Sequence, residues 1–218
     1  MDYVKSRYST KDIRGIRGRV FLTSDQGEPV LVAGEFGFGA PVTTAILEEL
    51  IGLGLRRFIA VGTAASIQYE IPVGTIVVCD KAIRDEGTSY HYTKPSKYAY
   101  PSQHLRDVIV CELKKKNVPF HIGPSWTTDA PYRETKEEIL RYQREGIATI
   151  DMEASALFSV AAFRDVQICS QFVVSDSIAD LVYSPHLYAR KTLRALERLT
   201  DTAISVLSAS GGSLPDRL

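Results

Sequence analysis

Three acidic residues at the ends of short apolar segments are the part of this sequence best suited to chemistry. Asp151 and Glu153 lie on either side of Met152, where a predicted strand gives way to an apolar helix, and Asp176 follows the apolar segment 168–174. Carboxylates at the ends of neighbouring strands meet in the crevice where α/β sheets bind ligands. A carboxylate can accept two hydrogen bonds from a vicinal diol, so the pattern favours a small polyhydroxylated substrate.

Each of these acids also has a purely structural explanation. An acid at the start of a helix often accepts the free N–H groups of the first turn, and it is favoured by the positive end of the helix dipole. Capping could explain Glu153 in this way, and a helix or turn cap could explain Asp176. The alternatives are a ligand contact by Glu153, with Met152 packed against a sugar or base, and proton donation by Asp176 beside apolar walls.

Two glycine-containing segments follow predicted strands. Segment 37–41 lacks the third glycine of a dinucleotide-binding GxGxxG motif, because that position is Val42, so it is either a tight turn or a ligand-lining loop. In segment 62–66, small residues and the hydroxyl of Thr63 suit an anion or a sugar. A simple strand-to-loop turn is the alternative for the second segment.

Composition narrows the class of protein. With 26 basic and 26 acidic residues among 218, the chain has no net charge, so we expect neither nucleic acid nor a membrane surface as a partner. The polar start and the absence of an apolar run of about 18 residues favour a cytoplasmic protein. The four histidines lack metal-ligand spacing, so no metal is expected. Cys79, Cys111 and Cys169 are expected to be buried, reduced thiols.

Strand-like and helix-like segments alternate along the chain. Strands are predicted at 21–23, 29–33 (after a turn at 25–27), 58–61, 73–83, 119–123, 148–150 and 168–174, and helices at 42–53, 102–117, 134–145, 154–163 and 185–207. This alternation predicts one α/β domain over residues 1–218 with a mostly parallel sheet. Segments 1–19 and 211–218 are the parts expected to be flexible.

Four blocks of the sequence resemble the nucleoside phosphorylase family, which contains hexameric purine nucleoside phosphorylases, uridine phosphorylases and related nucleosidases. The blocks are 37–41 with 48–50, 61–65 with 72–75, 128–132, and 151–153 with 174–176. The resemblance extends from about residue 25 to residue 207, and segment 84–92 is most similar to the uridine phosphorylase branch. It implies a single-domain, three-layer α/β/α phosphorylase-type fold with a mixed, mostly parallel central sheet. It also implies a homo-oligomer built from dimers, usually a hexamer, in which a neighbour completes each site.

The resemblance assigns roles to individual positions. For ribose binding it implies Asp151, Met152 and Glu153, with Asp151 in a supporting position. For phosphate binding it implies Thr63, with Arg14 or Arg17 as the arginine donated across the dimer. For the base it implies Ala64, Ala65, Pro131 and Tyr132. Asp176 corresponds to the catalytic acid that protonates a departing purine.

The expected activity is therefore nucleoside phosphorolysis, with inorganic phosphate as co-substrate and without a cofactor. Purine nucleosides are favoured by Asp176, and uridine is the alternative suggested by segment 84–92. Two features depart from the family pattern. The opening Gly-Asp-Pro-x-Arg loop has no counterpart in residues 1–20, and the arginine expected before Val61 is Ala60. These departures leave two alternatives: a nucleoside hydrolase that uses water, and a non-catalytic nucleoside-binding homologue.

Overall fold

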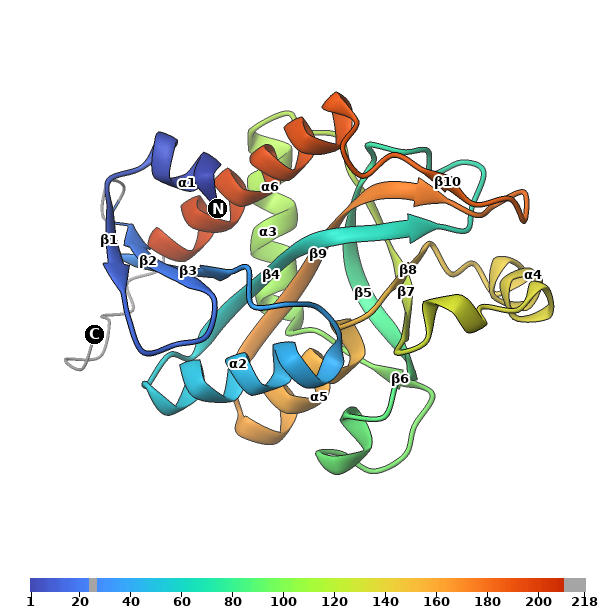
Figure 1. Cartoon of the computed structure of the whole chain (residues 1–218), viewed down its shortest axis with the longest axis horizontal. Helices are drawn as coiled ribbons and strands as arrows, with labels where there is room; N and C mark the ends of the chain where they lie inside the picture. The colour runs from blue at the N-terminus through green and yellow to red at the C-terminus, as the bar shows by residue number, and fades with distance from the viewer. Residues whose placement is uncertain (24–26, 210–218) are drawn as a thin grey trace.

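A mixed sheet of seven strands forms the centre of the protein (Figure 1). The computed structural model describes residues 1–23 and 27–209. In spatial order the strands are β10 (Ser184–Pro185), β9 (Gln167–Ser177), β4 (Arg57–Ser66), β8 (Thr149–Asp151), β7 (His121–Thr128), β5 (Ile76–Asp85) and β6 (Tyr98–Ala99). A separate antiparallel sheet contains β1 (Thr10–Ile13), β2 (Arg19–Thr23) and β3 (Val30–Gly34).

The two long pairings of the central sheet are parallel, whereas its short pairings are of both kinds. β4 pairs with β9, and β5 with β7, in parallel over most of their length. β5 also pairs with β9 in antiparallel fashion, so β9, β4, β8, β7 and β5 close into a barrel. The mixed, mostly parallel sheet expected from the sequence is confirmed, and its closure distinguishes it from an open sheet.

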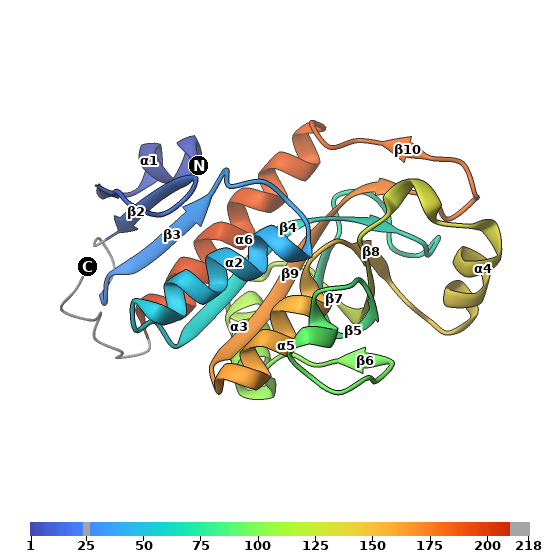
Figure 2. The ribbon, with the colours of Figure 1, turned by 60° about the horizontal axis from the view of Figure 1, so that its bottom comes forward.

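Helices cover both faces of this sheet (Figures 1 and 2). On one face lie α2 (Ala40–Gly52) and α5 (Ala154–Arg164), whose Leu47 and Phe158 share a cluster with Phe172 of β9. On the other face lie α3 (Gln103–Lys115) and α6 (Arg190–Ser208), whose Ile109 and Leu199 pack with Val173. The adjacent residues Phe172 and Val173 of β9 thus pack against opposite helical layers, because successive side chains of a strand point to opposite faces.

The ends of the chain differ most from the expected elements. Residues 2–7 form α1, where Val4 is buried, and β1 pairs with β2, although no element was expected before residue 21. The final helix begins at Arg190 instead of residue 185, because Pro185 belongs to β10, an edge strand where a missing N–H is tolerated. Part of the turn expected at 25–27, and the terminal segment 211–218, fall outside the described residues.

The remaining differences concern burial and helix α4. Segment 58–61 was expected to be a buried strand but is only half-buried in β4. Cys79 and Cys169 are buried, and burial raises the pKa of the Cys169 thiol to about 12, whereas Cys111 lies exposed on α3.

The helix expected at 134–145 is α4 (Lys136–Arg144), which begins at a capping box. Within the described residues, no helix has the length and apolar character needed to cross a membrane.

Candidate active site

Asp151 fixes the turn between β8 and α5. Its carboxylate is 3% exposed, and Oδ2 accepts hydrogen bonds from the backbone N–H groups of Glu153 (2.8 Å) and Ala154 (2.6 Å). Its Oδ1 accepts from the hydroxyls of Ser125 (2.7 Å) and Thr127 (2.9 Å) on β7. Burial raises the pKa of Asp151, and these four hydrogen bonds oppose that rise. Asp151 therefore caps the start of α5 and fixes the backbone of the residues that follow it.

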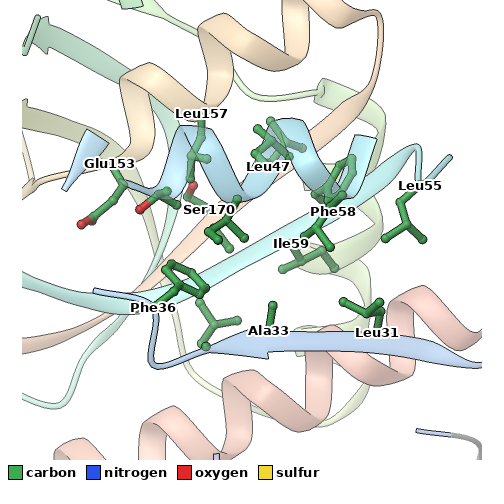
Figure 3. A pocket seen from close by; sticks show the side chains of 18 of the residues that line it. Leu31, Ala33, Phe36, Leu47, Leu55, Phe58, Ile59, Glu153, Leu157 and Ser170 are labelled. Atoms are coloured by element: carbon green, nitrogen blue, oxygen red, sulfur yellow. The ribbon is translucent and has the colours of Figure 1, made fainter. Parts of the chain in front are cut away.

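Because Asp151 caps the helix, the side chain of Glu153 is directed elsewhere. Its Oε1 accepts a hydrogen bond of 2.6 Å from the backbone N–H of Gly39, which lies 114 residues away in the sequence. The carboxylate lines a cavity (Figure 3). Burial, together with the charge of Asp151, raises the pKa of Glu153 to about 7. Glu153 therefore does not cap its own helix α5; its carboxylate accepts from the N-cap residue of α2 and also lines the cavity.

The glycine segment before α2 is both a tight turn and part of the cavity wall. Gly37 and Gly39 have φ values of 109° and 95°, a backbone region that residues other than glycine rarely adopt. Gly39 is also the N-cap of α2, so its N–H points out of the helix start toward Glu153. Gly37 and the exposed Phe38 line the cavity. Segment 37–41 is therefore a tight turn that also lines the cavity.

The cavity has a volume of about 800 Å³ and lies between β3, α2, β4 and α5 (Figure 3). This volume is within the range of small-ligand sites. Apolar side chains make up most of its wall, while Glu153 lies at one end and Arg56 and Arg57 mark the start of β4. Thr63 also lines the cavity, six residues along β4 from Arg57, a separation of about 20 Å in an extended strand. Arg57 is therefore too far to neutralise an anion bound at Thr63.

Asp176 belongs to a second acidic group. It lies near the end of β9, pairs with Ala65 of β4, and accepts a hydrogen bond from the hydroxyl of Ser175. Burial, and next the charge of Asp176, raise the pKa of Glu134 to about 7, and the same two causes raise the pKa of Tyr183. Sequence reasoning missed Glu134 because it is the first residue of the helix predicted at 134–145, to which no site role was given. Its place two residues after Tyr132 was the available signal.

The other predicted site residues are distributed over three settings. Met152 is half-buried in the turn that Asp151 fixes. Ala64 packs in the core beside α5, and Ala65 packs with the cluster around Trp126. Four of the predicted residues are exposed. Pro131 and Tyr132 lie in the 3-10 helix η2 (Pro131–Arg133), where Tyr132 is 100% exposed. Arg14 and Arg17 lie between β1 and β2. None of these seven residues (Met152, Ala64, Ala65, Pro131, Tyr132, Arg14 and Arg17) is among the described residues that line the cavity.

Segment 84–92 has a clear structural role. The buried Arg84 donates to the hydroxyl of Ser89 in the 3-10 helix η1 (Ser89–His91) at 2.9 Å and to the carbonyl oxygen of Lys94 at 2.7 Å. Glu86 accepts from the backbone N–H of Ser89 and from the hydroxyl of Ser155, both at 2.9 Å. These bonds fasten the loop to α5. In the part of the chain that the structure describes, no group of three or more His, Cys, Asp or Glu side chains is placed to hold a metal ion.

The fold is thus an α/β barrel beside a mostly apolar cavity that has the Glu153 carboxylate at one end. A model of the phosphorylase superfamily matches residues 2–210, and the chain belongs to this superfamily. A solved uridine phosphorylase from Vibrio fischeri is 27% identical and has a TM-score of 0.84. That match covers 96% of this chain and 87% of the other, and it confirms the phosphorylase-type fold.

Two relatives bear names that indicate different bases. A guanosine phosphorylase from Halorubrum lacusprofundi is 30% identical over 57% of this chain. A uridine phosphorylase from Escherichia coli is 28% identical over 62% of this chain. The matched regions span 52% and 59% of these two relatives, little more than half of their length.

Removing the Asp151 carboxylate should destabilise the fold. We expect Asp151→Ala to lower the free energy of unfolding by about 2–4 kcal/mol, because four donors lose their buried acceptor. Urea unfolding at neutral pH measures this change, with the exposed Glu137→Ala as the matched acidic control. Equal, small effects of the two substitutions would contradict the role given to Asp151.

The raised pKa of Glu153 should appear as a pH dependence of stability. Its pKa is 4.5 ordinarily and about 7 when folded, so between these values the folded state binds more protons than the unfolded state. The contribution of Glu153 to stability must therefore fall as pH rises through that window. Relative to the unmodified chain, Glu153→Gln should gain about 1–3 kcal/mol between pH 5 and pH 8.

Urea unfolding across this pH range tests the expectation for Glu153. Glu134→Gln is the matched control, since burial also raises the pKa of Glu134 to about 7. Each single substitution should remove part of the pH dependence, and the double substitution should remove more. A constant difference between Glu153→Gln and the unmodified chain at all pH values would show that Glu153 ionises normally.

Proposed function

We propose that this protein is a nucleoside phosphorylase, which cleaves the N-glycosidic bond of a nucleoside with inorganic phosphate to give the base and ribose 1-phosphate. The observation that carries this proposal is the position of Glu153. Its carboxylate is held in the cavity by the Gly39 N–H, while Asp151 takes over the capping of α5. A carboxylate presented in this way can accept hydrogen bonds from the 2′- and 3′-hydroxyls of ribose.

The proposed reaction divides the work between the two groups of acids. Glu153 and Met152 hold the ribose, which orients C1′ toward a phosphate oxygen near Thr63. The phosphate oxygen forms a bond to C1′ as the C1′–N bond breaks, and the bonding electron pair leaves with the base. Asp176 is the acid proposed to pass a proton to the departing base, and general-acid help of this kind contributes about 10²–10⁴-fold.

The proposal also covers which base the substrate carries and how the subunits assemble. Asp176 favours purine nucleosides, and the names of the relatives include both a guanosine and a uridine phosphorylase. Ala64, Ala65, Pro131 and Tyr132 are proposed to border the base from the Asp176 side. We further propose that the protein is cytoplasmic and forms a homo-oligomer built from dimers, namely a hexamer. In it, the exposed Arg14 or Arg17 of a neighbour would reach the phosphate.

A nucleoside hydrolase is the second candidate. Among the described residues that line the cavity, the cationic side chains are Arg56 and Arg57, which lie far from Thr63. Ala60 lines the cavity without the charge that the family carries there. Charge-assisted hydrogen bonds are the strong ones, so phosphate at Thr63 would be held weakly and water could take its place as the nucleophile.

Base release from inosine, guanosine, adenosine and uridine, followed with and without phosphate, tests the proposal. We expect release that requires phosphate, and a loss of more than about 100-fold for Glu153→Ala because the ribose is no longer held. Asp176→Asn should slow purine substrates more than uridine. Unfolding of each variant is measured as the control, so that lost activity is not lost fold.

The other outcomes of this assay are informative. Equal base release without phosphate would identify a hydrolase. Binding of nucleosides in calorimetry with no turnover of any of them would identify a non-catalytic homologue. Retained activity per folded molecule in Glu153→Ala would remove the basis of the proposal.

Restoring a cation at position 60 should strengthen phosphate binding. Ala60→Arg is expected to lower the KM for phosphate by about 10- to 100-fold, the range of one charge-assisted hydrogen bond, while the KM for nucleoside changes little. Ala60→Met adds similar bulk without charge and is the matched control. An identical effect of both substitutions on the KM for phosphate would show that charge at this position is irrelevant.

A further inference from the structure

One extra residue interrupts the pairing between β4 and β9 directly before Asp176. Ala64 pairs with Val174, but the next residue of β4, Ala65, pairs with Asp176, so Ser175 has no counterpart on β4. Such a β-bulge bends its strand and re-aims the side chains beside it. The bulge therefore sets the direction of the Asp176 carboxyl, and that direction lasts only if the chain beyond the bulge is held in place.

The chain beyond the bulge soon leaves the sheet. The last pair of residues between the two strands is Ser66 of β4 with Ser177 of β9. The N–H of Ile178 then donates to the carbonyl oxygen of Ser66 at 3.0 Å, and the buried residues Ile67 and Ala179 lie past the two strand ends. Buried backbone carbonyl groups need a hydrogen-bond donor, and the ladder between β4 and β9 ends too early to supply one here.

One side chain of α4 meets this need for both carbonyl groups. Gln143 lies in the last turn of α4, and Figure 1 shows this helix beyond the ends of β4 and β9. Its Nε2 donates to the carbonyl oxygens of Ile67 and Ala179, both at 2.8 Å. A side-chain amide has two N–H donors, so each carbonyl group can receive one. Gln143 thus joins the segments that follow β4 and β9 to each other and to α4.

The same helix places the second acidic group. Glu134 lies just before α4, and burial together with the charge of Asp176 raises its pKa to about 7. Ile139 and Tyr142 of α4 belong to an apolar cluster against which Ile178 packs. The contacts between α4 and the segment after β9 therefore determine how Asp176 lies relative to Glu134.

We propose that Gln143 is a positioning residue for the proposed phosphorolysis, and that it keeps the Asp176 carboxyl directed toward the departing base by holding together the segments after β4 and β9. The proposal rests on the proposed function, because it takes Asp176 as the acid on the base side. Gln143 acts through Asp176 and not by contact with the nucleoside. Such positioning matters because a displacement of about 1 Å can cost about 100-fold in rate.

Gln68 provides a matched control from the same group of hydrogen bonds. It is also a half-buried glutamine, and its Nε2 also donates to two backbone carbonyl oxygens, those of Gln143 (3.1 Å) and Ile147 (2.7 Å). Neither of these bonds reaches the segment after β9. Methionine is unbranched like glutamine but has no N–H donors. Gln143→Met and Gln68→Met therefore each remove two hydrogen bonds, and both should lower the urea midpoint by a similar amount.

Turnover of inosine with phosphate is the first test. Gln143→Met should lower kcat by about 10- to 100-fold with little change in KM, because the nucleoside is still bound while Asp176 is displaced. Gln68→Met should retain the kcat of the unmodified chain. In Asp176→Asn, adding Gln143→Met should cause little further loss, since residues that act through one another are not additive. Equal losses for the two glutamine variants, or additive losses with Asp176→Asn, would overturn the proposal.

An NMR titration of the Glu134 carboxyl is the second test, and it needs no turnover. If Gln143 holds Asp176 in place, Gln143→Met should lower the pKa of Glu134 toward its value in Asp176→Asn, whereas Gln68→Met should leave it unchanged. Glu138, whose charge also raises this pKa, is present in every variant. An unchanged pKa of Glu134 in Gln143→Met would overturn the proposal. A chain inactive on every nucleoside would instead remove the proposed function, and the titration would still show whether Gln143 places Asp176.

Discussion

The buried carboxylate of Asp151 is the constraint on which the arrangement of the site depends. Its two oxygens satisfy two N–H groups at the start of α5 and two hydroxyls on β7, so one side chain joins a helix to the barrel. A charge removed from water is tolerated only when such donors surround it. Because Asp151 accepts the N–H groups at the start of α5, the Glu153 side chain is free to reach the Gly39 N–H at the start of α2 and to line the cavity.

The barrel also separates the acids into two groups with different surroundings. β4 lies between β8 and β9, and its Ala65 pairs with Ile150 on one side and Asp176 on the other. Glu153 and Asp151 thus lie near α2 and α5, whereas Asp176 is grouped electrostatically with Glu134. Burial raises the pKa of both glutamates to about 7, which places their ionisation near physiological pH. Such a separation suits a reaction in which one group holds the sugar and another serves the base.

The cavity itself combines two different environments. Its Glu153 end has the polar groups of a ligand site, while the rest is an apolar space between two uncovered strand edges. Among the described residues that line the cavity, the cations Arg56 and Arg57 lie at the start of β4, away from Thr63, so a phosphate at Thr63 would depend on neutral donors.

The sequence by itself determined the superfamily, the mixed α/β fold, most of the elements and the importance of segment 151–153, because these follow from local periodicity and from motifs in a fixed order. Only the tertiary structure decided which acid caps α5 and which faces the cavity, since the deciding partners, Ser125 and Gly39, are far away in the sequence. The partial burial of Glu134 and of segment 57–63 of β4 likewise depends on which elements lie beside them. Pairing between distant segments leaves no local pattern, so the sequence could not show it.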